Sequence, residues 1–359
     1  MSYGFSERLL DGDRSTLLFA GVAVLLVVAP LVLPAYQKLL LAEVLVFAIF
    51  STAFNLLYGY TGLLSFGHAM FLAVSGYFIA NWLRTWSEAL GFAAFGGVEP
   101  LVSFAVGLVL AVAVATLLAT FVGYLSVQLR EIYFAMITLS FSMAIYVMAN
   151  NDIGGLTNGS DGMTHTLGTV NLFGLEIELI NILSYTNIYL IILAVFAVSM
   201  YALYRVVRSP FGMTCKAIRE NPGRAEALGI DVTHHSWLTF IISGAFSGLA
   251  GALLMVLERS IGPGIAYWST SAEPVIMTVI GGPASFLGPA IGSFTYVYLR
   301  EFITQIGLNN RWQLAFGLLL LVVVLFFENG VAGGLKTLAR RYGSDEGSGT
   351  EPMANGGED

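Results

Sequence analysis

The sequence predicts an all-α integral membrane protein, a polytopic helical bundle of about 8–10 transmembrane segments in which Gly and Pro break some helices. Three observations predict this fold class. The 359 residues are 57% hydrophobic and only 11% charged, with a mean hydropathy of +0.79, whereas soluble domains contain about 25% charged residues. Apolar runs of about twenty residues recur, and each can cross the roughly 30 Å hydrocarbon core as a helix. In addition, Gly and Pro interrupt one long run.

The individual spans follow from these runs in chain order. Uninterrupted runs lie near Leu17–Ala35, Leu39–Leu57, Leu63–Trp82, Leu101–Tyr124, Ile132–Ala149, Ile188–Tyr204, Trp237–Leu257 and Trp312–Phe327. A further run, Ala272–Leu299, is broken at Gly281-Gly282-Pro283 and again at Gly288-Pro289. The first run is expected to be a retained span, because a second apolar run rather than a cleavage site follows it.

Positive charges predict the orientation, because cytoplasmic loops carry an excess of Lys and Arg. With a cytoplasmic N-terminus, the sixth of these runs returns the chain to the cytoplasm at Arg205, and the opposite-side segment 150–187 contains no Lys or Arg. Lys336, Arg340 and Arg341 are cytoplasmic only if the number of crossings after the loop is even. The run Ala272–Leu299 must therefore cross twice as short segments or enter and leave on the same side.

The chain thus divides into three parts. Residues 1–15 are expected to form a cytoplasmic N-terminal segment. Residues 16–335 form a transmembrane domain with an extracytoplasmic loop at 150–187 and a cytoplasmic loop at 205–236. Residues 336–359 form an acidic cytoplasmic tail, rich in Gly and Ser, that we expect to be disordered. The one cysteine, Cys215, lies in the cytoplasmic loop, so neither an intrachain disulfide nor a cysteine metal site is expected.

The cytoplasmic loop is polar and rich in arginine. Its basic residues are Arg205, Arg208, Lys216, Arg219 and Arg224. We predict a short helix over Thr214–Ala227, broken near Asn221-Pro222-Gly223. One such basic segment in an apolar chain predicts a surface that docks a partner in the cytoplasm.

Two Gly-rich elements at corresponding positions of the two halves are candidates for a translocation path. The first is Asn55–Tyr77, and the second is Ile276–Phe294. Irregular backbone at membrane depth is tolerated where it is buried or lines a cavity, so such elements point to a path. Close packing of kinked helices is the alternative. His68 in the first element fits either a path or a neutral, hydrogen-bonded core position.

Shorter motifs complete the sequence-based expectations. The cluster Gly154–His165 has the composition of turns, and LFGLEIELINIL at 172–183 predicts a short interfacial helix. Glu273, directly before Pro274, is expected to cap the start of a helix. The chain contains no GxxxxGK[ST], HExxH or GxSxG motif, so we expect no enzyme activity and no bound cofactor or metal.

Four motifs together resemble a known family. They are NLLYGYTGLLSFGHAMF, GGLTNGSDGM, SPFGMTCKAIRENPGRAEALGI and IGGPASFLGPAIG, in this order. They resemble the permease subunits of branched-chain amino acid ABC importers, most closely the LivM type, over Leu39–Phe327. The resemblance implies the ABC importer permease type of fold and a prokaryotic cytoplasmic (inner) membrane location, with both termini in the cytoplasm.

The resemblance also implies partners and a role for the loop. The expected partners are a homologous second permease subunit, two cytoplasmic ABC ATPase subunits that use ATP and Mg, an extracytoplasmic substrate-binding protein and the lipid bilayer; no nucleic acid is expected. The ATPase-docking segment maps onto Ser209–Ile230, in which we single out Ser209, Gly212, Arg219, Glu220, Glu226 and Gly229. The candidate path residues are Asn55, Gly62, Ser65, Gly67, His68, Gly281, Gly282 and Gly288.

Alternative functions remain open at this point. Urea and short-chain amide importers use closely related permeases. A stand-alone, ion-coupled secondary transporter is a different class, and it would need ionisable groups within the spans, of which Glu43, His68 and Glu273 are the candidates. An intramembrane enzyme is disfavoured, because no nucleophile and base occur at suitable spacing.

Overall fold

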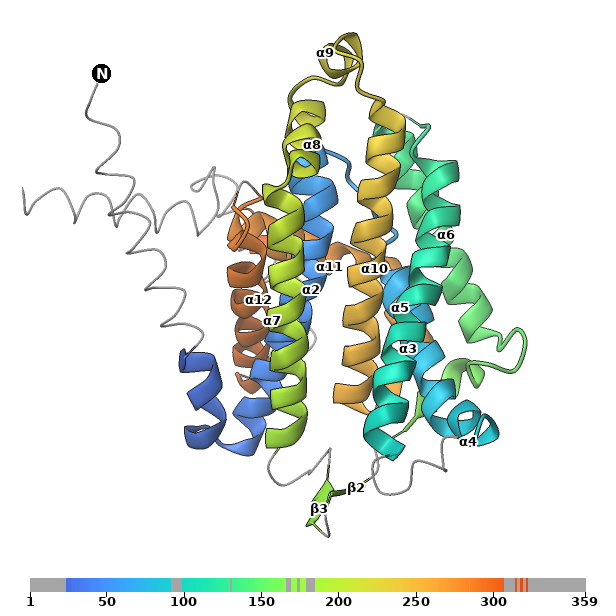
Figure 1. The fold of residues 1–359 in the computed structure, drawn as a ribbon, viewed down its shortest axis with the longest axis vertical. Helices are drawn as coiled ribbons and strands as arrows, with labels where there is room; N and C mark the ends of the chain where they lie inside the picture. The colour runs from blue at the N-terminus through green and yellow to red at the C-terminus, as the bar shows by residue number, and fades with distance from the viewer. Residues whose placement is uncertain are drawn as a thin grey trace, which may run out of the picture.

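Long helices lying side by side make up most of the described chain (Figure 1). The computed structural model describes residues 24–91, 99–129, 131–165, 169–172, 175–178, 185–283 and 285–306, and isolated positions at 314, 317, 318 and 321. The expected segments 1–15 and 336–359, and nearly all of the span predicted at 312–327, lie outside the described residues. Within the described ranges the predicted all-α class is confirmed, since the strands there are two to four residues long.

Two antiparallel helices, α2 (Ala35–Thr61) and α10 (Val232–Glu258), form the centre of the bundle. In their most apolar stretches, 89% and 72% of the residues are buried. The corresponding share is 22–28% for α5 (Glu99–Ser126), α6 (Glu131–Asn150) and α7 (Thr186–Arg208). The three outer helices therefore turn much of their apolar surface outward, as helices in contact with lipid do.

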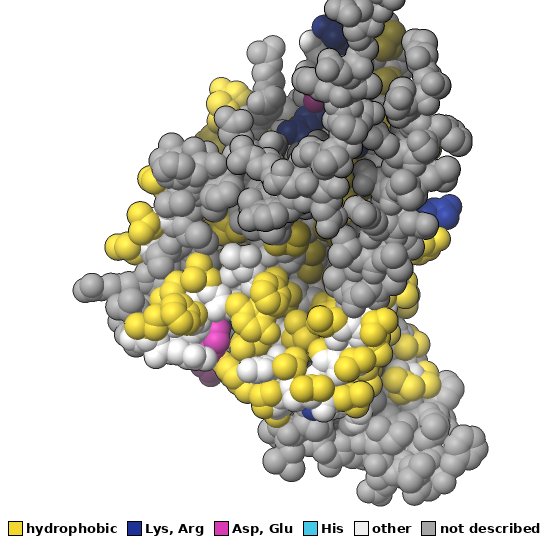
Figure 2. Space-filling model, turned by 90° about the vertical axis from the view of Figure 1, so that its left-hand side faces the viewer, with side chains coloured by type: hydrophobic (Ala, Val, Ile, Leu, Met, Phe, Trp, Pro, Cys, Tyr) yellow, Lys and Arg dark blue, Asp and Glu magenta, His cyan; other side chains and the backbone are white. Residues whose placement is uncertain are grey.

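The surface of the molecule fits a bilayer. On the face shown in Figure 2, hydrophobic side chains cover most of the described surface, and only isolated charged groups interrupt them. Large apolar side chains such as Val109, Leu117 and Phe121 of α5 are exposed. Among the described residues, α2, α5, α6, α7 and α10 are long and apolar enough to cross a membrane. They confirm five of the predicted spans.

The first Gly-rich element contains a break in the helix. Helix α2 ends at Gly62, whose φ of 84° is left-handed, and the N–H of Leu63 donates back to Leu57 O; glycine commonly closes helices in this way. The chain stays non-helical until α3 (Ala69–Asn81), which continues through a π-helical turn, η1 (Trp82–Trp86), into α4 (Ser87–Ala89). The helix predicted from Leu63 therefore begins only at Ala69, because Gly62 ends the preceding helix.

The second Gly-rich element forms a helical hairpin. After α10 come β4 (Ser260–Ile261) and the short helix η4 (Pro263–Ala266), and then α11 (Trp268–Gly281) packs against α12 (Gly288–Gln305). The cap predicted at Glu273 is wrong, because α11 already begins at Trp268 and Glu273 lies inside it. Its preceding turns are helical, and Pro274 is accommodated within the helix.

The contacts of α12 with α2 show the direction in which the second half of the broken run lies. Ser293 pairs with Ser51, and Arg300 pairs with Glu43 nearer the start of α2, so α12 runs antiparallel to α2. At the tip of the hairpin, Phe286 contacts Tyr204 in the last turns of α7. The tip of the hairpin thus lies near the end of α7, and α12 returns toward the end of the bundle where α2 begins.

The two halves pack as inverted repeats. Helices α3 and α5, which follow α2, pack against α10, whereas α11 and α12, which follow α10, pack against α2. In each half a long helix is followed by a break, a short helix and a further helix. Because α2 and α10 are antiparallel, the two halves have opposite orientations, an arrangement found in many transporters.

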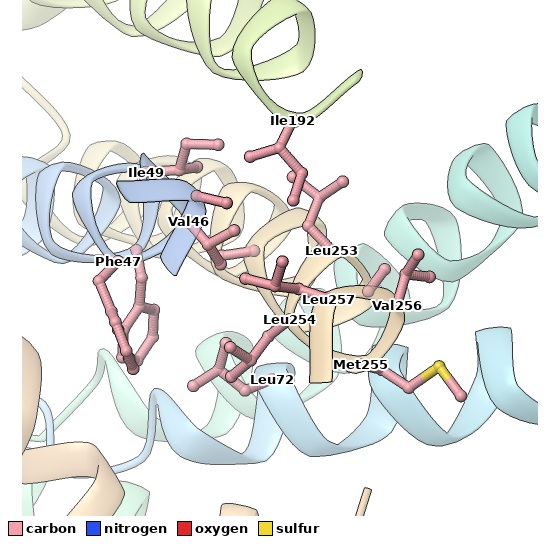
Figure 3. Packing of buried hydrophobic residues seen from close by; sticks show 14 of the residues in the cluster. Val46, Phe47, Ile49, Leu72, Ile192, Leu253, Leu254, Met255, Val256 and Leu257 are labelled. Atoms are coloured by element: carbon pink, nitrogen blue, oxygen red, sulfur yellow. The ribbon is translucent and has the colours of Figure 1, made fainter. Parts of the chain in front are cut away.

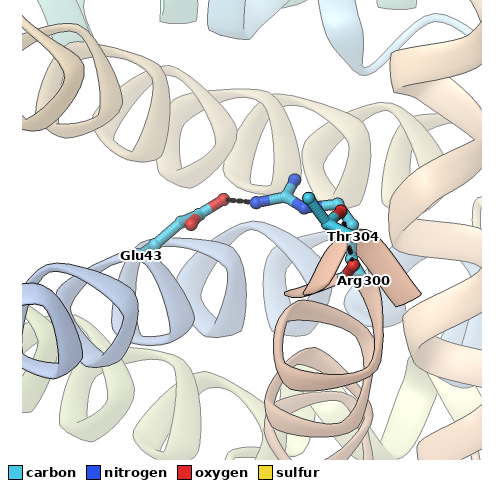
Figure 4. Close-up of polar contacts among 3 residues, drawn as sticks. All are labelled: Glu43, Arg300 and Thr304. Carbon is cyan, nitrogen blue, oxygen red and sulfur yellow. Dashed lines mark hydrogen bonds and ion pairs between the residues drawn. The ribbon is translucent and has the colours of Figure 1, made fainter. Parts of the chain in front are cut away.

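Apolar packing and one ion pair hold these halves together. Val46 and Ile49 of α2 meet Leu253 and Leu257 of α10, and Ile192 of α7 closes the cluster (Figure 3). At the end of the bundle where α2 begins, the Arg300 guanidinium of α12 donates to the Glu43 carboxylate (Figure 4). The partner is necessary because Glu43 is buried within the bundle.

The loop after α6 is built from turns, as predicted. The Asp152 carboxylate accepts hydrogen bonds from the N–H and hydroxyl of Thr157 and the N–H of Asn158, which lower the pKa of Asp152. Farther along, β2 (Thr169–Leu172) and β3 (Leu175–Glu178) pair antiparallel. The interfacial helix predicted at 172–183 is therefore wrong at 175–178, where Leu and Ile alternate with Glu at the period of a strand; residues 179–183 lie outside the described residues.

Candidate functional site

The loop predicted to be cytoplasmic, 205–236, contains two short helices at one end of the bundle (Figure 1). Helix α8 (Pro210–Glu220) begins with a proline at its first position, and α9 (Pro222–Ala227) follows after Asn221. The side chain of Asn221 accepts from the N–H of Arg224 and so caps α9. The predicted break near Asn221 is confirmed, although α8 begins four residues earlier than predicted.

The inner face of α8 is fixed to the membrane helices. The Cys215 thiol lies 3.4 Å from the Thr239 hydroxyl of α10, and burial raises its pKa. The Phe211 ring stacks on His235 at 4.2 Å between centroids. These contacts anchor α8 to the start of α10, so a force applied to α8 reaches the bundle.

The outer surface of α8 and α9 is exposed and partly apolar. Met213 and Leu228 are 69% and 79% exposed, next to the exposed charges of Glu220, Arg224 and Glu226. Large apolar side chains exposed on a polar surface indicate a site of protein contact. The sequence did not single out Met213 and Leu228. In a chain that is 57% hydrophobic, an apolar residue does not by itself indicate an exposed contact surface.

The predicted docking residues fall into two groups. Glu220, Glu226 and Gly229 are exposed, and Gly229 has a left-handed φ of 85° at the end of α9. Gly212 is buried where a Cβ would lie 2.2 Å from Val207 O, so it serves packing. The remaining two are held by hydrogen bonds: the partly buried Ser209 donates its hydroxyl to Val206 O, and Arg219, although exposed, donates to Gly59 O of α2.

Several predicted path residues lie where α2 meets the hairpin. Asn55 is fully buried, and neither atom of its amide has a hydrogen-bond partner among the described residues. A Cβ on Gly59 would lie 1.9 Å from Asn55 Oδ1 and 2.6 Å from Pro283 O. Gly281, Gly282 and Gly288 are in backbone contact, since a Cβ on Gly281 would lie 1.7 Å from Gly288 O and one on Gly288 would lie 2.1 Å from Gly282 O.

His68 belongs to a second polar cluster, between α2, α3 and α10. Its Nε2 lies 2.8 Å from Ser243 Oγ, and the Ser243 hydroxyl donates to Ala53 O at 2.6 Å. Because a serine hydroxyl has one hydrogen, Nε2 must carry the proton and donate to Ser243. Nδ1 is then an acceptor, and it has no partner among the described residues. The rings of Phe54, Phe71 and Phe240 surround the imidazole edge-on.

The other predicted path residues shape the break before α3. The Ser65 hydroxyl accepts from the N–H of Gly67, and a Cβ on Gly67 would lie 2.5 Å from Thr138 O. Gly62 lies against Arg219, since a Cβ on Gly62 would be 3.3 Å from Arg219 Cγ. The structure therefore brings Asn55 together with the three hairpin glycines, and places Ser65, Gly67 and His68 in a separate group.

The three candidate groups for ion coupling lie in two places. Glu43 is paired with Arg300, and the Glu273 side chain interacts with Tyr296 near that pair. His68 instead contacts Ser243 and the aromatic rings of α2, α3 and α10. The three groups therefore do not form one shared site.

Comparison with known proteins identifies relatives over most of the chain. A family profile described as "Branched-chain amino acid transport system / permease component" matches residues 38–325. The chain is 26% identical over 305 residues to the high-affinity branched-chain amino acid transport system permease protein LivM of Salmonella typhimurium, covering 80% of this chain and 68% of that protein. It is 24% identical to LivM of Escherichia coli, covering 90% and 76% of the two chains.

A second group of relatives is similar over a shorter stretch. The high-affinity branched-chain amino acid transport system permease protein LivH of Escherichia coli is 30% identical over 153 residues, which cover 42% of this chain and 49% of that protein. No solved structure shows a significant match.

Proposed function

The chain belongs to the family of branched-chain amino acid transport permeases, and from this premise we propose that it is a pore subunit of an ATP-driven importer. It is a multi-pass membrane protein and a transport permease rather than an enzyme. The observation that carries the proposal is the match over residues 38–325, which includes both broken elements and the cytoplasmic loop. The cargo we propose is a branched-chain amino acid, as in the names of the relatives.

The proposed assembly contains a second permease, two ATPases and a binding protein. The similarity to LivH supports a homologous permease as the partner within the membrane. Exposed Met213 and Leu228, with Glu220 and Glu226 beside them, suit the docking of an ATPase that binds ATP and Mg itself. The turn-rich loop after α6 lies at the opposite end of the bundle (Figure 1), where a binding protein would deliver the substrate.

The proposed orientation places the docking loop and both chain termini in the cytoplasm, in the inner membrane of a prokaryote. The distribution of charge supports it: the loop at 205–236 is rich in arginine, whereas segment 150–187 has neither Lys nor Arg.

The mechanism we propose is alternating access. The hairpin of α11 and α12 meets α2 at Gly59, which lies against Pro283 O, and at a hydroxyl pair, Ser51 with Ser293 at 2.8 Å. Small residues allow two packed helices to slide or separate as bodies. ATP binding and release by the partner ATPases would favour different positions of these bodies, since a ligand shifts an equilibrium only through its unequal affinity for the two states.

Uptake into proteoliposomes tests the proposal. The chain would be reconstituted alone and then with its co-purifying membrane and ATPase subunits and binding protein, with and without ATP. We expect leucine uptake only in the complete, ATP-supplied assembly, and little uptake of urea or acetamide in its place. Leucine uptake by the lone chain under an ion gradient would instead identify a secondary transporter, and preferential uptake of urea or acetamide would identify the other substrate class.

A further inference from the structure

Arg219 is an exposed basic residue of the docking loop whose guanidinium contacts the membrane helix α2. It lies on α8, one residue before the end of that helix. Its Nη1 donates to Gly59 O, in the last turn of α2 and 160 positions earlier in the chain. Its aliphatic part lies against Gly62, where α2 ends. The guanidinium therefore connects the docking helix to the point at which the first broken element begins.

Gly59 O requires such a donor. In a continuing helix, the N–H of Leu63 would donate to Gly59 O, but here it donates to Leu57 O because the chain turns at Gly62. The charged guanidinium takes the place of that N–H. A cation is also favourable at this position, since the C-terminal end of a helix carries partial negative charge.

The same glycine is a contact point of the second broken element. With no side chain, Gly59 allows Pro283 O at the hairpin tip and Asn55 Oδ1 to approach its Cα closely. The neighbouring Phe286 of the tip contacts Tyr204 of α7. A shift of Gly59 would thus act directly on the tip of the hairpin and on Asn55.

Asn55 indicates that this region has a second arrangement. An amide that is fully buried, with neither atom hydrogen-bonded among the described residues, carries a substantial desolvation cost. The cost disappears if the amide gains partners when the tip moves, either from the backbone of the break or from the polar end of an amino acid. The closed packing around Gly59 is then one of two states.

We propose that Arg219 is a positioning residue that transmits movement of the docking helix to the junction of α2 and the hairpin tip, and so couples ATP hydrolysis to opening of the path. This role deepens the proposed importer function and rests on it. The hydrogen bond to Gly59 O distinguishes Arg219 from Glu220, Glu226 and Leu228, which in this proposal contact the ATPase. A helix cap that serves only stability is the competing explanation.

The test uses the complete reconstituted assembly carrying Arg219→Gln, Arg219→Lys or the control Arg84→Gln. Arg84 is exposed and lies in η1, directly before α4, and α4 is at the opposite end of the bundle from α8 (Figure 1). Three quantities are measured for each: the ATPase bound per permease, the rate of ATP hydrolysis, and the rate of substrate uptake. The ratio of uptake to hydrolysis reports coupling, and a cap that serves only stability would leave it unchanged.

We expect Arg219→Gln to bind the ATPase and hydrolyse ATP as the parent does, while uptake per ATP falls about tenfold, within the range of typical coupling free energies. Arg219→Lys should give an intermediate ratio of uptake to hydrolysis, since an ammonium keeps the charge but lacks the several donors of a guanidinium. If Arg219→Gln does not assemble, the ratio measured for Arg219→Lys tests the proposal. An unchanged ratio in the assembled variants, or loss of ATPase binding from a folded permease, would overturn the proposal. Absence of ATP-driven uptake in the parent would overturn the importer function itself, independently of Arg219.

Discussion

Replacing Gly292 with alanine should separate the two helices of the hairpin. Gly292 lies on α12 where a Cβ would be 1.7 Å from Met277 O of α11. Because a carbon–oxygen contact needs about 3.4 Å, the two backbones must move apart by roughly 1.5–2 Å. Met277 O belongs to the backbone of a helix and cannot rotate away as a side chain would.

The expected cost has two parts. Overpacking in a filled interior costs about 1–3 kcal/mol, and the fixed backbone favours the upper end of that range. Moving α12 also stretches the 2.8 Å contact between Ser293 and Ser51, and an interhelical hydrogen bond in a membrane is worth about 0.6 kcal/mol. We therefore expect Gly292→Ala to lower the free energy of unfolding by about 2–4 kcal/mol.

Reversible unfolding in mixed detergent micelles, followed by tryptophan fluorescence, measures this change. Gly264→Ala is the matched control, because a Cβ there meets nothing within 4 Å and Gly264 does not have a left-handed φ. The control should stay within about 0.5 kcal/mol of the parent, as surface substitutions do. If Gly292→Ala also stays within that margin, the close backbone contact inferred for the hairpin is refuted.

Four further predictions test other parts of the structure. His68→Gln keeps a donor at the position of Nε2 and should retain more stability than His68→Asn, which we expect to cost about 1–3 kcal/mol in the same unfolding assay; equal losses would contradict the assigned tautomer. Arg300→Met leaves the buried Glu43 carboxylate without its partner and should cost about 3–5 kcal/mol, and adding Glu43→Gln should recover part of the loss. Because the folded-state pKa of Asp152 is lowered, its stabilisation of the loop is present above the unfolded pKa of about 3.9 and is lost as pH falls through the folded pKa; the hydrogen-exchange protection factors of the loop amides, corrected for the intrinsic rate at each pH, should therefore fall with acid in the parent but not in Asp152→Asn. Leu228→Ser should weaken ATPase binding at least tenfold, since burying a leucine side chain is worth about 1.5–3 kcal/mol, and co-purification at the parental level would remove Leu228 from the docking surface.

Local patterns made much of the fold predictable. The spans at α2, α5, α6, α7 and α10 follow from runs of apolar residues whose length matches the bilayer. The break between α8 and α9 follows from Asn221-Pro222, since the residue before a proline is disfavoured in a helix. In each case the decisive information lies within a few turns of the chain.

The errors arose where neighbours in space overrode local pattern. Glu273 before Pro274 suggests the start of a helix, yet the packing of α11 against α12 and α2 extends that helix back to Trp268. The run from Leu63 is apolar enough to be helical throughout, yet Gly67 is pressed against Thr138 O of α6 and the helix begins after it. The pattern at 175–178 is amphipathic at the period of a helix and also at the period of a strand, and pairing with β2 makes it a strand.

The candidate site shows the same division. Composition, apolar run length and the placement of positive charge by themselves determined that the chain is a multi-span membrane protein with one arginine-rich loop, because these properties depend on the residues present and not on contacts between them. Only the tertiary structure decided that Arg219 donates to Gly59 O, that Leu228 is exposed, and that Asn55 lies beside the hairpin tip. Some of these contacts join residues more than 200 positions apart in the chain, such as Gly59 and Pro283. They form only when whole helices pack together, and the periodicity of a local segment does not predict that packing.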